Sequence, residues 1–165
     1  MSSDKNDIHS QVQAARDRHL RDGCRMSFGG LAPLQGWLTD ELLTLGGKIN
    51  QFEVTESALT DQLAYRATLA ENPDRVRIGP NIVGEFFGDC SSTLLLYAHA
   101  DTDPVVTKHV RAGHGVTETD GRVVAPGIAD DVSGLTAILS ALKMVADSSL
   151  EPAHAVTIAS ILGKQ

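Results

Sequence analysis

Cysteine is scarce in this chain, and its scarcity excludes two kinds of site. The 165 residues include two cysteines, Cys24 and Cys90, which lie in unrelated sequence contexts. Two such residues cannot supply a disulfide framework or a zinc site with four thiolate ligands. A reducing compartment is therefore the default expectation.

Concentrated positive charge is missing as well. The chain has 14 lysines and arginines against 21 aspartates and glutamates, which gives a formal net charge of −7. Because the sequence contains no basic run or stripe, nucleic acid is a poor candidate partner. A peptide or another small molecule is a better candidate ligand.

The sequence also lacks long apolar segments. Residues 1–20 are polar and charged without the apolar core of a signal peptide, and no later stretch approaches the roughly 18 apolar residues of a membrane span. We therefore expect a cytoplasmic protein with no membrane partner. Hydrophobic residues make up 42% of the chain, which suffices for a core without disulfides.

The pattern of apolar residues predicts helices that alternate with strands. Helical spacing over residues 7–21 predicts an amphipathic helix that Gly23 ends. A second helix is expected through residues 37–45, closed by Gly46-Gly47, because glycine favours helix C-termini. A third helix is expected over residues 131–145, with Asp and Ser at its start.

Extended segments are expected between and after these helices, at residues 48–54, 80–88, 93–99, 122–124 and 155–162. The second and third of these segments are separated by a turn and predict an antiparallel hairpin. The 93–99 segment is apolar at nearly every position, which predicts a central strand buried on both faces. Asp120-Gly121 predicts another hairpin turn before the fourth segment. Together the elements predict one α/β domain built on a single sheet.

A histidine and an aspartate stand where the 93–99 strand ends. His99 and Asp101 are two residues apart, so in a strand they project to the same side. Neutral imidazole is a good ligand for zinc-like cations, and a carboxylate on its second nitrogen orients the ring. The alternative is a polar strand end with an ordinary hydrogen-bonded histidine.

An acidic pair, Asp130-Asp131, precedes the third expected helix. A helix N-cap needs one acidic oxygen, so capping alone does not explain two adjacent carboxylates. A carboxylate that bridges two cations on an irregular backbone explains the glycine, small-residue and acidic pattern together. The alternative is capping by one aspartate beside a solvated neighbour.

In this order the segments resemble the M20 type of co-catalytic metallopeptidase, the aminoacylase and carboxypeptidase-like dinuclear hydrolases. The segment LLLYAHADTDP (94–104) is similar to the family strand that ends in His-x-Asp-Thr-x-Pro, and GIADD (127–131) is similar to its bridging aspartate. The Asp-Asp-x-Ser-Gly pattern is also close to the related M28 aminopeptidases. The resemblance covers about half of the chain, roughly residues 80–165.

The resemblance implies a fold and a set of roles. The fold is a zinc-exopeptidase-like α/β sandwich of the phosphorylase/hydrolase kind, with a mixed, mostly parallel sheet flanked by helices. His99 and Asp130 are implied to bind metal, with Asp130 as the bridging ligand. Asp101 is implied to be the catalytic residue that orients His99. Asp131 is implied to follow Asp130 through a cis peptide bond.

One motif departs from the family pattern. In the family a Glu-Glu pair follows the next central strand, and its first glutamate is the general base while the second binds metal. At about that interval this sequence has Lys164 and Gln165. A charged lysine has no lone pair to act as a base near a dication, and glutamine is a weak neutral ligand.

Three interpretations of this departure stay open. In the first, residues 1–165 are the N-terminal part of a single catalytic domain, and the remaining ligands, the base and a lid or dimerisation domain lie on a further segment or another chain. In the second, this is a divergent enzyme with one labile metal that acts on an aromatic or cyclic amine. In the third, it is a non-catalytic homologue that serves in binding or assembly.

The expected function is hydrolysis of a carbon–nitrogen bond in a peptide, amide or N-acyl amino acid by a metal-activated water. Zn²⁺ is the expected cation, Mn²⁺ and Co²⁺ are the alternatives, and one or two ions are expected. The expected partners are a peptide or small-molecule substrate and a second copy in a homo-oligomer. His109 and His114, in the polar loop after the metal strand, are candidates for contact with substrate, although loop histidines are more often solvated.

Overall fold

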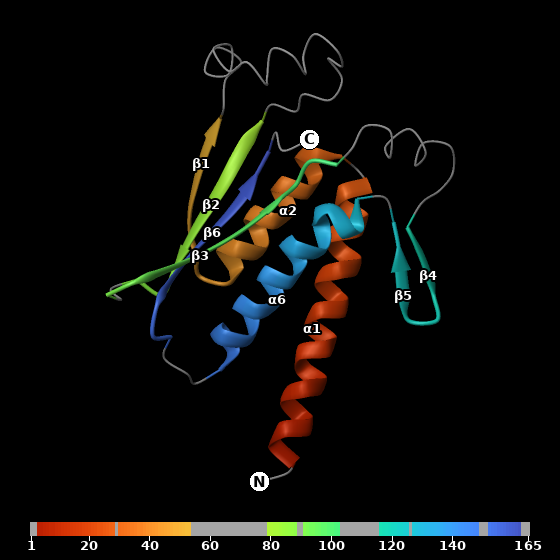
Figure 1. Cartoon of the computed structure of the whole chain (residues 1–165), viewed down its shortest axis with the longest axis horizontal. Helices are drawn as coiled ribbons and strands as arrows, with labels where there is room; N and C mark the ends of the chain where they lie inside the picture. Colours follow the sequence, from red (N-terminus) through yellow and green to blue (C-terminus); the bar gives the residue numbers. More distant parts are fainter. Residues whose placement is uncertain are drawn as a thin grey trace.

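In the part of the chain that the structure describes, three helices lie on one side of a four-stranded mixed sheet, and a small two-stranded hairpin stands apart from it (Figure 1). This arrangement confirms the expected α/β class with a sheet flanked by helices. The computed structural model describes residues 3–28, 30–53, 79–88, 91–102, 116–125, 127–148 and 152–162.

The described helices and strands have the following bounds, in chain order. The elements are α1 (Ser3–Phe28), α2 (Leu31–Thr44), β1 (Lys48–Glu53), β2 (Pro80–Phe86), β3 (Thr93–His99), β4 (Thr117–Thr119), β5 (Arg122–Val124), the π-helical turn η2 (Ile128–Val132), α6 (Ser133–Asp147) and β6 (Ala155–Ile161). Among the described residues, none of the helices is both long and apolar enough to cross a membrane.

The strand order in the main sheet is β1-β2-β6-β3. Strand β2 pairs antiparallel with both β1 and β6, whereas β3 pairs parallel with β6. The sheet is mixed as expected, but among the described strands it is not mostly parallel. The hairpin expected between β2 and β3 is therefore wrong, because β6 lies between them. Two parallel strands need a long crossover, which α6 supplies between β3 and β6.

Strand β3 is not the doubly buried central strand that its composition predicts. It lies at the edge of the sheet formed by the described strands, and its side chains are exposed over residues 93–95 and buried at Ala98 and His99. Leu96 and Ala98 pack against the core. Leu95 and Tyr97 project from the opposite face and are 58% and 67% exposed. An apolar strand sequence predicts burial, but the neighbours that would cover both faces are decided elsewhere in the chain.

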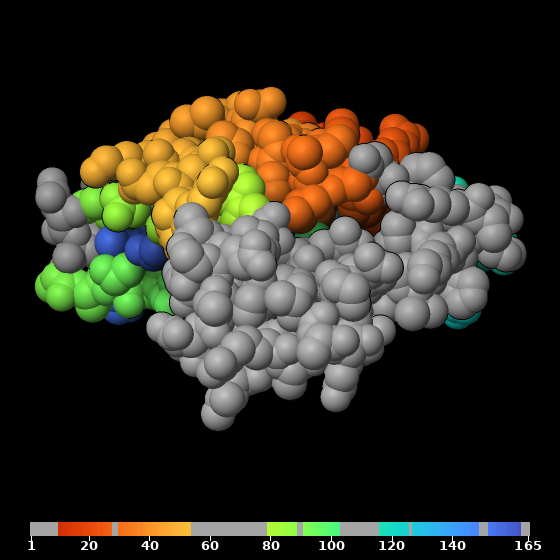
Figure 2. All heavy atoms as spheres, turned by 90° about the horizontal axis from the view of Figure 1, so that it is seen from above, coloured from red at the N-terminus to blue at the C-terminus, as the bar shows by residue number. Residues whose placement is uncertain are grey.

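The hydrophobic core lies between the sheet and the helices α2 and α6. Fully buried leucines on these helices face isoleucines of the two inner strands β2 and β6. The largest of these buried side chains are Leu34, Leu38, Leu42, Leu135, Leu139, Ile82 and Ile158. On the outer side, α2 and β1 form one continuous surface, drawn orange to yellow in Figure 2.

Helix α1 runs past the glycine that was expected to end it and reaches Phe28. A Cβ atom on Gly23 would lie 2.7 Å from the Thr136 side chain and 3.3 Å from that of Val132. The glycine therefore lets α1 approach α6 closely and does not serve as a stop signal. A helix tolerates an isolated glycine at a cost of about 1 kcal/mol, so packing decides its place here.

Two local turn predictions are confirmed. Gly46 has a left-handed backbone (φ 84°) after α2, and the Gly46 and Gly47 amides donate to the carbonyls of Leu43 and Leu42, as in a Schellman motif. Asp120 and Gly121 both have positive φ between β4 and β5, as a type I′ hairpin turn requires.

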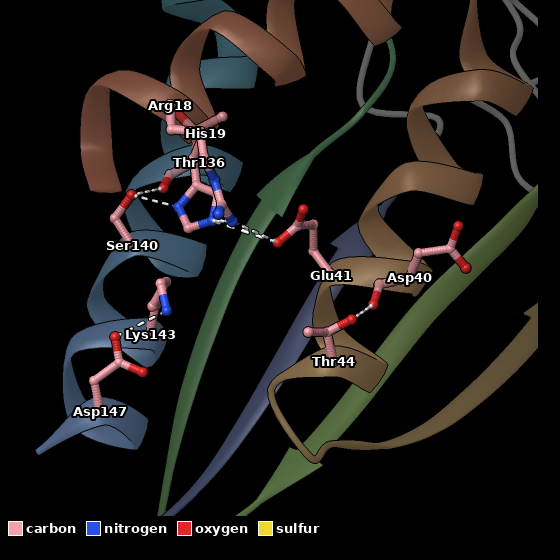
Figure 3. A network of polar contacts seen from close by, with 9 residues as sticks. All are labelled: Arg18, His19, Asp40, Glu41, Thr44, Thr136, Ser140, Lys143 and Asp147. Atoms are coloured by element: carbon pink, nitrogen blue, oxygen red, sulfur yellow. Dashed lines mark hydrogen bonds and ion pairs between the residues drawn. The ribbon is translucent and has the colours of Figure 1, made fainter. Parts of the chain in front are cut away.

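A buried polar network joins the three helices (Figure 3). Ser140 donates its hydroxyl hydrogen to the Thr136 carbonyl at 2.7 Å. Since that hydrogen is used, His19 Nδ1 must donate to Ser140 Oγ, at 2.9 Å. His19 Nε2 then accepts a hydrogen bond from Arg18 Nη2, at 3.2 Å. Each hydrogen in this series of hydrogen bonds therefore has a fixed donor and acceptor, and the geometry holds His19 neutral.

The network contains the residue types of a catalytic triad, serine, histidine and a carboxylate, but its role is structural. Glu41 Oε2 forms an ion pair with Arg18 Nη2 at 3.2 Å and lies 3.5 Å from His19 Nε2. Both His19 and Ser140 are buried, so no substrate reaches the hydroxyl. The apolar helical spacing of α1 includes position 19, and this is the signal that places the histidine in the helix interface.

We expect the free energy of unfolding to fall as the pH drops below about 6.5, the usual pKa of histidine. Burial lowers the pKa of His19, the Arg18 charge lowers it further, and Glu41 and Asp22 oppose them. The unfolded chain therefore binds a proton at a higher pH than the folded chain. Stability is unaffected above the unfolded pKa and is lost as the pH falls from there toward the folded pKa. Urea unfolding at about pH 7.5 and about pH 5.5 measures the difference.

The control for this measurement is a second histidine variant. His19→Gln should flatten the pH dependence, whereas His154→Ala should keep it because His154 is exposed. An unchanged slope in His19→Gln would contradict the role of this side chain.

Candidate metal centre

His99, Asp101 and Asp130 come together where β3 ends and the turn η2 begins. His99 is the last residue of β3, and Asp101 follows two residues later. Both are buried, with 3% and 2% of their surface exposed. Asp130 lies in η2, which packs against the end of β3, and its side chain is 58% exposed. The site thus has a buried imidazole, that of His99, and an exposed carboxylate, that of Asp130.

Asp101 fixes the ring of His99. His99 Nδ1 lies 2.9 Å from the Asp101 backbone carbonyl oxygen and 3.4 Å from its carboxylate Oδ1. A carbonyl oxygen can only accept, so Nδ1 carries the hydrogen and donates it. The other ring nitrogen, Nε2, is thereby aimed away from the strand end.

Asp130 meets that second nitrogen. Its Oδ1 lies 2.7 Å from His99 Nε2. Two hydrogen-bond acceptors do not approach this closely by themselves, so the pair needs either a shared proton or a cation. Imidazole nitrogen and carboxylate oxygen are both ligands of zinc-like ions, so the donor set fits a divalent metal.

The turn that carries Asp130 is irregular and closely packed. Gly127 has a left-handed backbone (φ 70°), and a Cβ atom there would lie 3.0 Å from Thr102 Cβ. The Val132 amide donates to the Gly127 carbonyl at 3.2 Å, which closes the turn. Asp130 (φ −145°, ψ 83°) and Asp131 are non-helical, and the peptide bond between them is cis. Sequence reasoning missed Thr102, whose contact with Gly127 joins the two segments of the site.

The two aspartates of the acidic pair have different surroundings. Asp130 contacts His99, whereas the carboxylate of Asp131 lies against Gly134 in the first turn of α6. The helix itself starts at Ser133 and has no side-chain N-cap hydrogen bond. The capping that the sequence suggested for this pair is therefore not formed.

The described part of the chain supplies an incomplete ligand set. Within it, no group of three or more His, Cys, Asp or Glu side chains is placed to hold a metal ion. His109, His114, Lys164 and Gln165 lie outside the described residues. Cys24 is no ligand candidate, because burial raises the pKa of its thiol to about 11.

Residues 95–161, which span both metal-site segments, match Peptidase family M20/M25/M40. Carboxypeptidase G2 of Pseudomonas sp. (strain RS-16) is 33% identical over 96 residues, which are 58% of this chain and 22% of that protein. Over these residues the chain is similar to the M20-type metallopeptidases. The match contains His99, Asp101 and Asp130, so the family resemblance and the geometry concern the same segments.

Solved structures show the same fold at low sequence identity. Human carnosine dipeptidase 1 aligns with 94% of this chain and 34% of its own, with a TM-score of 0.67 and 15% identity. A glutaminyl cyclase of Fimbriiglobus ruber aligns with 92% of this chain and 45% of its own, with a TM-score of 0.58 and 17% identity. A Zn-dependent exopeptidase of Parabacteroides distasonis aligns with 89% of this chain and 45% of its own, with a TM-score of 0.54 and 19% identity. The chain thus spans less than half of these chains and about a fifth of carboxypeptidase G2.

Proposed function

We propose that the protein containing this chain is a metal-dependent hydrolase of carbon–nitrogen bonds in peptides, amides or N-acyl amino acids. The observation that carries the proposal is the approach of His99 Nε2 to Asp130 Oδ1 at 2.7 Å, within a segment matched by the M20 family.

Each residue has a definite task in this proposal. His99 and Asp130 bind the cation, and Asp101 holds the imidazole in the tautomer that leaves Nε2 available. The exposed carboxylate of Asp130 faces solvent, from which a substrate and a second cation arrive. When bound, a divalent metal supplies Lewis-acid polarisation of a carbonyl and lowers the pKa of a coordinated water.

We propose Zn²⁺ as the physiological cation, with Mn²⁺ and Co²⁺ as substitutes. Histidine nitrogen favours zinc, and carboxylate oxygen also suits manganese and cobalt. One solved neighbour in the fold comparison is a Zn-dependent exopeptidase.

The catalytic unit is proposed to be larger than this segment. His99 and Asp130 are two donors, whereas catalytic zinc sites take three protein ligands and an open position. We propose that the further ligands and the general base come from a second segment or a partner chain, because the relatives are more than twice as long as the part that aligns. An intact mass of the natural protein measures its length directly.

Removal and return of metal test this function. The purified natural protein, stripped with a chelator, should lose hydrolysis of a panel of dipeptides and N-acyl amino acids, and Zn²⁺, Mn²⁺ or Co²⁺ should restore it. The rate constant against added metal is the measurement, and elemental analysis gives the stoichiometry. A protein that takes up no transition metal and cleaves none of the panel would be a binding or assembly module. Cleavage of a cyclic amine alone would make it the divergent aminohydrolase.

A further inference from the structure

Asp131 stands beside the proposed ligand Asp130 but faces the other way. A Cβ atom placed on Gly134 would lie 2.8 Å from Asp131 Cγ and 2.9 Å from its Oδ2. Such distances are shorter than real Cβ contacts, so the carboxylate occupies the space that any side chain at position 134 would need. Because Gly134 has no side chain, the Asp131 carboxylate fits against the first turn of α6, and we call this space at Gly134 the seat of Asp131.

We infer that Asp131, seated on Gly134, is a positioning residue that holds Asp130 against His99. The backbone of Asp130 and Asp131 is non-helical, so regular helical hydrogen bonds do not fix this pair. Its support comes from both sides. Val132 is fully buried, its amide is bonded to the Gly127 carbonyl, and the Asp131 carboxylate rests on α6.

Electrostatics favours the same seat. The first turn of a helix carries a partial positive charge from its unsatisfied amides, which attracts a carboxylate. With Asp131 turned toward this helix end, Asp130 is turned toward His99, at 2.7 Å from Nε2. If the seat were filled, the turn would shift and that contact would open.

A double-mutant cycle on Asp131 and Gly134 tests the inference. In metal-free protein at one pH, the ¹⁵N chemical shift of His99 Nε2 reports its contact with Asp130. Asp131→Ala should move that shift, and so should Gly134→Ala. In the Asp131→Ala background, Gly134→Ala should add almost nothing, because the group that it displaces is already gone. Asp131→Asn, which fills the seat with the same shape, should restore most of the native shift.

Zinc affinity supplies a second readout, which rests on the proposed function. Asp131→Ala or Gly134→Ala should weaken Zn²⁺ binding roughly 10- to 100-fold, the usual loss when a group that orients a ligand is removed. The matched control is Gly36→Ala in α2, where an added Cβ meets nothing within 4 Å. Gly36→Ala should leave Zn²⁺ affinity unchanged and raise the melting temperature, because alanine favours helix.

The outcomes separate this inference from the proposed function. If the wild type binds no Zn²⁺ yet the cycle in the His99 shift is non-additive, the metal function fails and the positioning role stands. If Gly134→Ala has the same effect in both backgrounds, or Asp131→Ala leaves the shift unchanged, the positioning role is overturned. Circular dichroism confirms that each variant is folded before it is compared.

Discussion

Replacing His99 by alanine is expected to abolish hydrolysis and to lower zinc affinity by more than about 100-fold. Loss of a group that only orients a ligand already costs roughly 10- to 100-fold, and His99 is proposed as a ligand itself. The replacement also leaves the Asp130 carboxylate without the ring nitrogen that lies 2.7 Å away. Competition with a chromophoric chelator measures the affinity, and initial rates measure the activity.

The matched control is the loss of an exposed histidine. His154 contacts Ser92 on the surface, beside the end of β3 opposite to His99. His154→Ala should keep both the affinity and the rate. Equal zinc binding in His99→Ala and the wild type would show that the cation binds elsewhere, and the proposed centre would be wrong.

Leu42→Ala is expected to lower the free energy of unfolding by about 2–5 kcal/mol, the range for a fully buried leucine. Leu42 is completely buried between α2 and the sheet, close to Gly84 of β2. Truncation removes apolar contacts and leaves a cavity that a packed core closes only in part. Urea unfolding, followed by circular dichroism, gives the difference.

The next residue in the same helix is the control. Leu43 is 53% exposed, so Leu43→Ala removes the same atoms with little change in buried area. Its effect should stay within about 0.5 kcal/mol, as for most surface substitutions. A loss as large as that of Leu42→Ala would mean that α2 packs with its other face inward.

Features that depend on a few neighbouring residues were predictable. The Gly46-Gly47 helix end and the Asp120-Gly121 turn need left-handed backbone, which these residues adopt at little cost. The class of fold was predictable too, because apolar periodicity is a local property of each segment. Both segments of the candidate metal centre were predicted from a histidine and an aspartate at a strand end, two adjacent aspartates before a helix, and the resemblance of these segments to one family.

Features that depend on distant partners were not predictable. The hairpin between β2 and β3 was wrong because β6, formed much later in the chain, pairs with both. Gly23 was expected to end α1, yet it is a contact point with α6. The exposure of Leu95 and Tyr97 likewise depends on which elements cover the face of β3.

The sequence by itself predicted the resemblance to the M20 family, the fold class and His99, Asp101 and Asp130 as candidate site residues, because these follow from local pattern and residue chemistry. Tertiary structure alone decided that His99 Nε2 faces Asp130 at 2.7 Å and that Asp131 turns away onto Gly134. It also decided that His19 is buried between three helices. Those facts depend on how strands pair and helices approach, and such distances between remote segments arise only when the whole chain packs.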